Sequence, residues 1–256
     1  MLEYRYDGTF SGFLTSVFDA FSRKEQPDAI LPPESQGLLF AEVHRVDTNP
    51  EQSERVWAGI RKTGGDLTGE HLYYAFLSRE EGVETVLLRY CQHLFNCRQP
   101  VMTDLGNSDV LTVHKLYRKV AREAHRVLMF LRFEQAADGT YFAPYAPKYD
   151  VVPLVAGHFK ARFADQSWII YDTRRDYGIC FNAKDGHIDR FSFEAPAFNA
   201  ADGKLNPGIE HPDEDNWQAL WRAYFKGTAI AERKNPTLQM NFMPKRFWKY
   251  LTEKRI

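Results

Sequence analysis

The sequence predicts an α+β fold in which helices pack around a small, mostly antiparallel sheet. The chain has 256 residues, of which 44% are hydrophobic and 26% charged, enough to bury a core. Apolar residues recur mostly at the helical period of 3.6 as far as residue 129, and the period then changes to 2. We therefore expect a single domain over residues 1–256, which could subdivide into residues 1–129, 130–194 and 214–256.

The first subdivision is expected to combine helices with short strands. A short edge strand over residues 1–8 ends in the turn signal Asp7-Gly8, and a second strand over residues 37–46 follows the proline-rich break ILPPES. Helical periodicity predicts further segments over residues 9–24, 49–64, 68–96 with a break near Gly82, and 109–131.

The second subdivision is predicted to be a β-β-α-β-β unit near residues 130–194. Asp138-Gly139 lies between two alternating runs, a strong hairpin signal, and Pro153 suits the first turn of a helix. The other predicted segments are a helix over residues 150–165, two strands within 167–182, a third strand within 186–194, an exposed loop over 195–213, a helix over 213–235 that Asn235-Pro236 breaks, and a terminal helix over 244–256.

The formal net charge of −1 hides two basic segments in acidic surroundings. Residues 111–132 hold 6 Lys and Arg against 1 Glu, and residues 217–256 hold 9 against 2 acidic residues. A fold that brings both segments to one side would have a cationic face, the footprint of a nucleic acid or another polyanion. The alternative is that the basic residues are scattered over solvated faces.

The helix over residues 109–131 concentrates cations on its polar face, at positions 115, 118, 119, 122 and 126. Like charges at i,i+4 spacing repel each other, and an anionic partner would relieve that repulsion. We therefore take Arg118, Arg122 and Arg126 as nucleic-acid-binding candidates. His125 lies on the flank and could contact a phosphate or a base, or hydrogen-bond a nearby carboxylate.

The C-terminal segment interleaves cations with aromatic rings, the mixture that phosphate neutralisation and base stacking require. Aromatic residues at helical spacing are more often core, so we expect Trp217, Trp221 and Tyr224 to be buried. Further nucleic-acid-binding candidates share polar or cationic character near turns: Arg175, Arg222, Arg233, Asn235, Gln239, Lys245 and Trp248. Asn235-Pro236 is also an ordinary helix stop.

Candidate catalytic groups are imidazoles and carboxylates that could pair for proton transfer: Glu123 with His125, and Asp172 with His158. Cys91, His93 and Cys97 lack a fourth ligand, so we expect no metal. The sequence has no cysteine cluster for an iron–sulfur centre and no phosphate-binding glycine loop, so we expect no cofactor. Whether the protein is an enzyme is left open.

No apolar run approaches the length of a membrane span, and the N-terminus lacks the layout of a signal peptide, so we expect a cytoplasmic protein without membrane contact. The three cysteines agree with a reducing compartment, because they are odd in number and lack a disulfide-type spacing.

Segments in register along nearly the whole chain carry a family resemblance: YDGTFSGFLTSVFDA, LYRKVAREAHRVLMFLRF, LVAGHFKARFADQSWIIYDTRRDYG and LWRAYFKGTAIAERKNPTLQMNFMPKRFWKYL. With them the chain resembles an uncharacterised bacterial family built on a domain of unknown function and assigned in general terms to DNA metabolism or DNA repair. Members are typically encoded beside a radical-SAM protein and are sometimes fused to a uracil-DNA glycosylase. The resemblance therefore implies work on DNA and a radical-SAM partner, and it transfers no catalytic residue.

Positions characteristic of that family are present in this chain: Tyr6, Asp7, Gly8, Arg122, Glu123, Ala124, His125, Arg126, His158, Phe159, Arg162, Asp172, Arg175, Arg222, Arg233, Asn235, Gln239, Met243, Pro244 and Trp248. We expect a subset drawn from separate segments to line one groove: His125, His158, Asp172, Arg175, Arg233 and Gln239. The alternative is that Asp172 only pairs with Arg175 to hold a turn and that His158 only packs under it.

The sequence thus favours a DNA-binding accessory factor of a repair or base-modification system that acts with a radical-SAM partner. One alternative is a DNA-acting hydrolase, glycosylase-like or nuclease-like, with its general acid or base among His125, His158, Asp172 and Glu123. Another is a protein-interaction scaffold whose basic faces bind an acidic partner.

Overall fold

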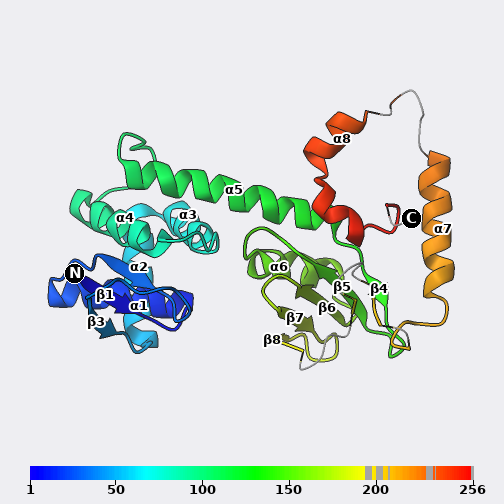
Figure 1. The fold of residues 1–256 in the computed structure, drawn as a ribbon, viewed down its shortest axis with the longest axis horizontal. Coiled ribbons are helices and arrows are strands. Elements are labelled where there is room, and N and C mark those ends of the chain that lie inside the picture. The colour runs from blue at the N-terminus through cyan, green and yellow to red at the C-terminus, as the bar shows by residue number, and fades with distance from the viewer. Residues whose placement is uncertain (194–197, 200–203, 207, 229–232, 234, 255–256) are drawn as a thin grey trace. The chain divides into compact units, whose positions relative to one another are not determined.

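The computed structural model confirms the α+β class (Figure 1) and describes residues 1–193, 198–199, 204–206, 208–228, 233 and 235–254. The chain forms two compact units, Met1–Ala121 and Arg122–Ile256. The boundary between them falls within the long helix α5, Ser108–Phe130. None of the helices described is long and apolar enough to cross a membrane.

The first unit contains a three-stranded sheet in the order β2-β1-β3, built from Leu2–Arg5 (β1), Ala29–Leu31 (β2) and Glu42–Arg45 (β3). Both pairings are parallel, and β1 is the central strand, so the predictions of an edge strand and of mostly antiparallel pairing are wrong for this sheet. Helix α1 (Phe10–Arg23) lies between β1 and β2 in the chain and provides the crossover that parallel strands need. Of the strand predicted over residues 37–46, only β3 forms. Strand β2 was not predicted, because its last residues belong to the segment ILPPES, which was interpreted as a break.

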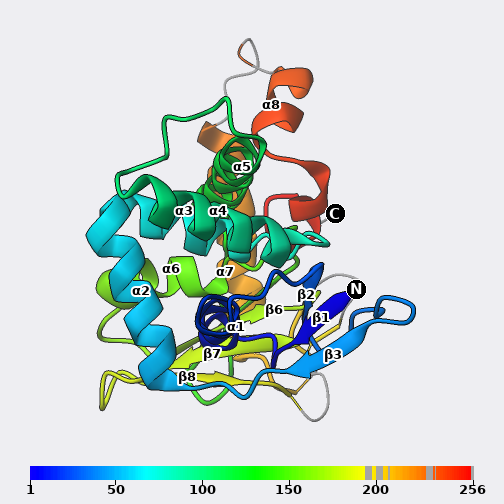
Figure 2. The same ribbon diagram turned by 90° about the vertical axis from the view of Figure 1, so that its left-hand side faces the viewer.

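The helices of the first unit agree with the predicted segments: α2 is Pro50–Gly64, α3 is Asp66–Phe76 and α4 is Val83–Cys97. Asn49 caps α2 by accepting the amides of Glu51 and Gln52. Gly82, in the left-handed region at φ 75°, provides the predicted break before α4. Helix α1 packs along α2, and α3 and α4 pack on each other (Figure 2).

The second unit contains a five-stranded sheet in the order β4-β5-β6-β7-β8, which confirms the predicted β-β-α-β-β unit. Its strands are Glu134–Gln135 (β4), Tyr141–Tyr145 (β5), Trp168–Asp172 (β6), Tyr177–Phe181 (β7) and Ile188–Phe191 (β8). Every pairing is antiparallel except that of β5 with β6, where helix α6 (Val152–Arg162) supplies the crossover. The predicted hairpin turn is present, with Gly139 at φ 85°.

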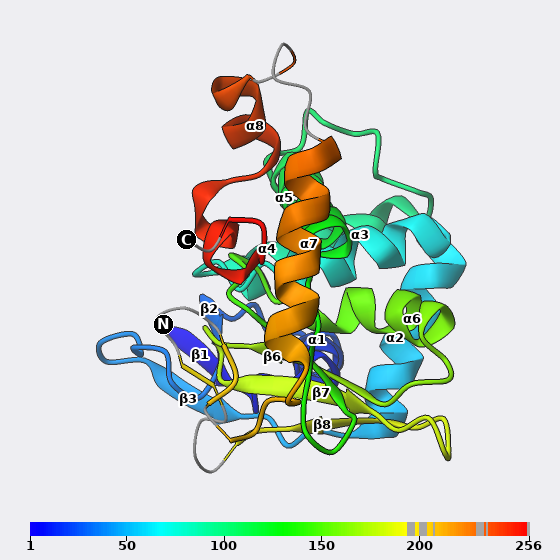
Figure 3. The same ribbon diagram turned by 90° about the vertical axis from the view of Figure 1, so that its right-hand side faces the viewer.

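The chain returns to the β4 edge of this sheet before its last helices. Phe198 and Leu205 are buried against Phe142 and Tyr171, so the predicted exposed loop over residues 195–213 is wrong at those two positions; residues 194–197, 200–203 and 207 lie outside the described residues. Backbone hydrogen bonds join Ala137 to Ile209 and Gln135 to His211. Helix α7 (Glu214–Thr228) follows; Figure 1 labels it beside β4, and Figure 3 shows it rising upright away from the strands β6 and β7.

The C-terminal elements differ from the prediction. The predicted helix over residues 213–235 is described as far as Thr228, and residues 229–232 and 234 lie outside the described residues. Asn235-Pro236 begins helix α8 (Pro236–Phe242), because Asn235 accepts the amide of Leu238 and proline suits a first turn. In place of the terminal α-helix there is a short 3-10 helix, η2 (Lys245–Tyr250).

Candidate functional site

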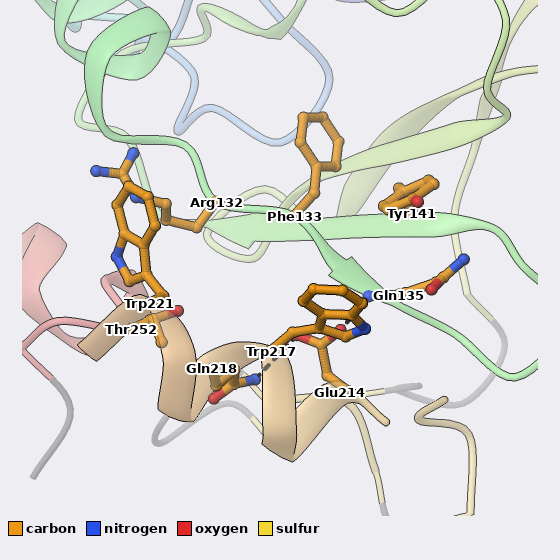
Figure 4. Close-up of a pocket in the computed structure, with 9 residues that line it drawn as sticks. All are labelled: Arg132, Phe133, Gln135, Tyr141, Glu214, Trp217, Gln218, Trp221 and Thr252. Carbon is orange, nitrogen blue, oxygen red and sulfur yellow. Dashed lines mark hydrogen bonds between the residues drawn. The ribbon is translucent and has the colours of Figure 1, made fainter. Parts of the chain in front are cut away.

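A cavity of about 440 Å³ in the second unit lies between α7 and the strands β4 and β5 (Figure 4). We call it the α7 pocket, and its volume falls in the range of small-ligand sites. It is lined by Arg132, Phe133, Gln135, Tyr141, Glu214, Trp217, Gln218, Trp221 and Thr252. These residues come from the segment between α5 and β4, from β4 and β5, from α7, and from the segment that follows η2.

Aromatic rings form two sides of the α7 pocket. Trp217 and Trp221 project from α7, and Phe133 and Tyr141 lie across the pocket from them (Figure 4). Trp217 is 61% exposed, Trp221 40% and Tyr224 63%, so the prediction that these rings are core is wrong. Glu214 and Gln218 are the residues that α7 buries, and its aromatic positions are left open to solvent and to the pocket.

Trp221 and Arg132 are both anchored by one carboxylate, that of Glu253. The indole Nε1 of Trp221 donates to Glu253 Oε2 over 2.9 Å, and an Arg132 guanidinium nitrogen donates to Glu253 Oε1 over 3.0 Å. The guanidinium carbon of Arg132 lies 5.7 Å from the centroid of the Trp221 ring. Burial acts to raise the pKa of Glu253, but the bonds from Trp221 and the charge of Arg132 outweigh it and hold that pKa below its ordinary value.

Two residues that line the pocket, Arg132 and Gln218, each have a buried polar atom without a hydrogen-bond partner among the described residues. The Gln218 amide nitrogen donates to Glu214 Oε1 over 3.2 Å, and the Gln135 backbone amide donates to Glu214 Oε2 over 3.0 Å. Within the described part of the chain, Gln218 Oε1 and Arg132 Nε are buried without a hydrogen-bond partner. Both atoms are enclosed by protein atoms, and a buried polar group without a partner costs free energy.

The anchoring of Trp221 should depend on pH. Ionised Glu253 contributes stability that is complete above its ordinary pKa of 4.5 and is lost as the pH falls through its lowered pKa. Tryptophan fluorescence followed from neutral pH downward should therefore show a transition below 4.5 that the Glu253→Gln variant lacks. An identical acid profile in the variant would contradict this role for Glu253.

Glu123, a predicted catalytic group, is a buried anchor in the second unit. Its side chain is 2% exposed and accepts hydrogen bonds from the Arg246 guanidinium and, over 2.8 Å, from the Lys148 backbone amide. Arg126 lies 3.7 Å away as a further ion-pair partner. His125 is exposed, and among the residues described it makes no hydrogen bond with Glu123. The two therefore do not form the predicted proton-transfer pair in this structure.

Asp172, at the end of β6, holds the turn that follows it. The carboxylate is fully buried and accepts the backbone amides of Arg174 (2.9 Å) and Arg175 (3.2 Å) and the Arg175 guanidinium (2.7 Å). Burial raises the pKa of Asp172, and Arg175 opposes that rise. Arg175 also donates to the carbonyls of Pro147 and Lys148. These contacts match the alternative in which Asp172 and Arg175 fix the turn.

The remaining candidates divide into exposed and engaged side chains. Exposed positions are His125, His158, Arg118, Arg122, Arg222, Arg233 and Lys245. Gln239 accepts a bond from Lys254, Trp248 donates to the Met243 carbonyl, and Asn235 caps α8. Of the six residues expected to line one groove, only Asp172 and Arg175 are joined by a hydrogen bond or ion pair among the described residues. Their convergence stays a prediction.

The cysteines occupy unlike environments. Cys91 is buried, and burial raises the pKa of its thiol to about 12. Cys97 is exposed with its sulfur 3.7 Å from His93 Nδ1 and 3.9 Å from Nε2, so the sulfur faces the ring rather than one nitrogen. No group of three or more His, Cys, Asp or Glu residues suited to a metal occurs among the described residues. The expected absence of a metal stays a prediction.

Comparison with known families matches residues 81–253 to a domain of unknown function, DUF4130. The chain belongs to this family. All the residues that line the α7 pocket fall within the DUF4130 match, whereas the three-stranded sheet of the first unit lies before it. Neither the curated proteins nor the solved structures contain a match to the chain.

Sequence reasoning missed most of this pocket. Trp217 and Trp221 were noticed but assigned to the core, and Arg132 was counted only as part of a basic segment. Gln135, Tyr141, Glu214 and Gln218 carry no motif that would connect them, because the backbone bonds between β4 and residues 209–214 bring them together. The signal that could have indicated the pocket is the pair Trp217 and Trp221 in a helix with an acidic start, Glu214 and Asp215.

Proposed function

We propose that the protein binds DNA through its second unit and acts as an accessory factor in DNA repair or base modification. The observation that supports this most is the open α7 pocket, which solvent-exposed tryptophans line together with other aromatic residues. Proteins that bind single-stranded nucleic acid stack unpaired bases on exposed aromatic rings and neutralise the phosphates with nearby lysines and arginines.

The charge of the surrounding segment supports the same proposal. Residues 217–256 contain 9 Lys and Arg against 2 acidic residues. Arg222 on α7 and Arg122 on α5 are exposed and have no ion-pair partner among the described residues. Unpaired exposed arginines suit phosphate oxygens, because the guanidinium can donate two parallel hydrogen bonds.

A role in DNA repair and a radical-SAM partner are also part of this proposal, and both are supported by the family resemblance alone. The catalytic alternative receives less support, since Glu123 and Asp172 are each held by arginine and backbone amides. Co-purification of the tagged protein with a radical-SAM protein from its native cells would support the partnership, and repeated recovery without one would contradict it.

DNA binding should weaken with salt and depend on the exposed arginines of the second unit. We expect the Arg122→Gln, Arg222→Gln double variant to lower the slope of log affinity against log salt by about 0.7 to 0.9 for each phosphate that the variant no longer neutralises. Fluorescence polarisation with single-stranded and duplex oligonucleotides at several salt concentrations measures this.

The matched control removes two exposed cations from the first unit, Arg45→Gln and Lys62→Gln. It has the same change in net charge and should leave the salt slope close to that of the unaltered protein. Equal losses of affinity in both double variants would indicate a general charge effect. Unaltered affinity in the Arg122, Arg222 double variant would contradict the role of these two arginines in DNA binding.

A further inference from the structure

We infer that Arg126 and Arg246, both held by the buried carboxylate of Glu123, form a binding site for one phosphate group. The inference rests on the proposed DNA-binding function and deepens it, because it assigns one particular phosphate contact to the second unit. It also makes Glu123 a positioning residue, which holds the two guanidinium groups in place.

Two elements far apart in the chain bring these arginines together. Arg126 lies in the C-terminal part of α5, and Arg246 belongs to η2, which lies beside the end of α5 (Figure 1). One guanidinium nitrogen of each arginine lies within 3.7 Å of the same atom, Glu123 Oε2. Groups that meet at one carboxylate oxygen are close enough for the oxygens of a single phosphate to bridge them.

Most N–H groups of the two arginines are left without a partner among the described residues. Each guanidinium has five N–H donors. Arg126 makes one hydrogen bond, of 3.5 Å to the Asn241 carbonyl, and its 3.7 Å contact with Glu123 is longer than a hydrogen bond. Arg246 makes one, to Glu123. The arginine side chains are 21% and 40% exposed, and Nε and Nη1 of Arg126 are not enclosed by protein atoms, so donors remain for a ligand.

The charges around Glu123 do not balance. Among the described residues, Glu123 is the one carboxylate in an ion pair with Arg126 or Arg246, so two positive charges share a single negative charge. Arg122, one turn earlier on α5, is exposed and adds a third positive charge. Cations at i,i+4 spacing repel each other, and a phosphate would offset that repulsion.

The C-terminal segment that carries this site also supports the α7 pocket. Arg246 lies in η2, and Glu253, which follows η2, anchors Trp221 and Arg132 at the pocket. Contacts with phosphates fix how a nucleic acid lies on a protein without reading its sequence. A phosphate bound by the arginines would therefore orient a strand whose bases are offered to the rings of the pocket.

The first test measures how two single strands of one sequence bind to the full-length protein, by fluorescence polarisation of a 3′ label. One strand ends in a 5′-hydroxyl and the other in a 5′-phosphate. We expect Arg126→Gln to weaken binding about tenfold, the loss of one charge-assisted contact. Equal losses on both strands would identify an internal phosphodiester as the ligand, and a loss confined to the 5′-phosphorylated strand would identify a terminal phosphate.

The matched control is Lys184→Gln, which removes an exposed cation from the turn between β7 and β8. It makes the same change in net charge as Arg126→Gln and should alter affinity by less than about twofold.

A second variant, Glu123→Gln, separates positioning from general attraction. It adds one positive charge to the protein, so attraction of DNA to net charge alone predicts tighter binding. Loss of the anchor for the two arginines predicts binding weaker by about threefold. Tighter binding by the folded variant would overturn the positioning role. Arg126→Gln should fold even if Glu123→Gln does not, because Arg126 lies beyond hydrogen-bond distance of Glu123.

Inorganic phosphate provides a measurement that does not depend on DNA. At matched ionic strength it should raise the melting temperature of the unaltered protein more than that of Arg126→Gln, because a ligand stabilises the state that binds it. If no strand binds and this difference is still found, the proposed function fails and the phosphate site stands. Equal behaviour of Arg126→Gln and Lys184→Gln, with both strands and with inorganic phosphate, would overturn the site.

Discussion

Replacing Asp172 by alanine is expected to destabilise the second unit by about 3–5 kcal/mol. The substitution removes a fully buried carboxylate and leaves the Arg175 guanidinium, which is 19% exposed, without its counter-charge. It also leaves the part-buried amides of Arg174 and Arg175 without their acceptor, which adds a smaller cost because water can reach part of each site. Chemical denaturation of the full chain, followed by circular dichroism, measures the destabilisation.

Two further variants make this test specific. Asp172→Asn retains an oxygen for the two amides but presents an amide nitrogen to the Arg175 guanidinium, so its loss of stability should be smaller yet clear. Asp189→Ala removes an exposed carboxylate from β8 in the same sheet and should change stability by less than about 0.5 kcal/mol. A catalytic Asp172 would behave differently: Asp172→Asn would keep stability and DNA affinity and lose turnover.

Helix positions before the C-terminal segment could be predicted closely, because the signals that set them are local. The predicted segment over residues 109–131 and the observed α5, Ser108–Phe130, differ by one residue at each end. Asn49 and Gly82 mark helix starts through their own side chain or backbone angle, and both were recognised. The hairpin at Gly139 is local in the same sense.

Strand pairing in the first sheet could not be predicted, because it depends on residues far apart in the chain. Strand β2 has only three residues and runs into Pro32 and Pro33, which cannot donate to a ladder. It pairs with β1, from which it is separated along the chain by helix α1. In a single sequence, three apolar residues followed by two prolines are read as the start of a turn, so this short parallel strand was not predicted.

The exposure of the α7 tryptophans could not be predicted for a related reason. Periodicity identifies an apolar face but cannot tell whether another element covers it. In the structure, α7 buries Glu214 and Gln218 instead, because the pairing of residues 209–211 with β4 brings the start of the helix to that edge. The face that sequence reasoning assigned to the core became the wall of the candidate site.

The second large effect is expected at Glu123. Changing it to alanine should destabilise the second unit by about 2–4 kcal/mol, because the Lys148 amide loses its acceptor and Arg246 loses a buried counter-charge. The effect should be smaller than at Asp172, since the Arg246 side chain is 40% exposed and water can replace part of the missing interaction. Thermal and chemical denaturation of the full chain measure it.

His125→Ala provides the matched control, because His125 lies two residues farther along the same helix and is exposed. If His125 has no catalytic role, this substitution should change the free energy of unfolding by less than about 0.5 kcal/mol. If Glu123 and His125 instead worked as a catalytic pair, both variants would abolish a DNA-directed activity while remaining as stable as the original protein. A large loss of stability at Glu123 alone therefore assigns that carboxylate to the fold: its partner Arg246 lies 123 residues away in the chain, an interaction that no local pattern reveals.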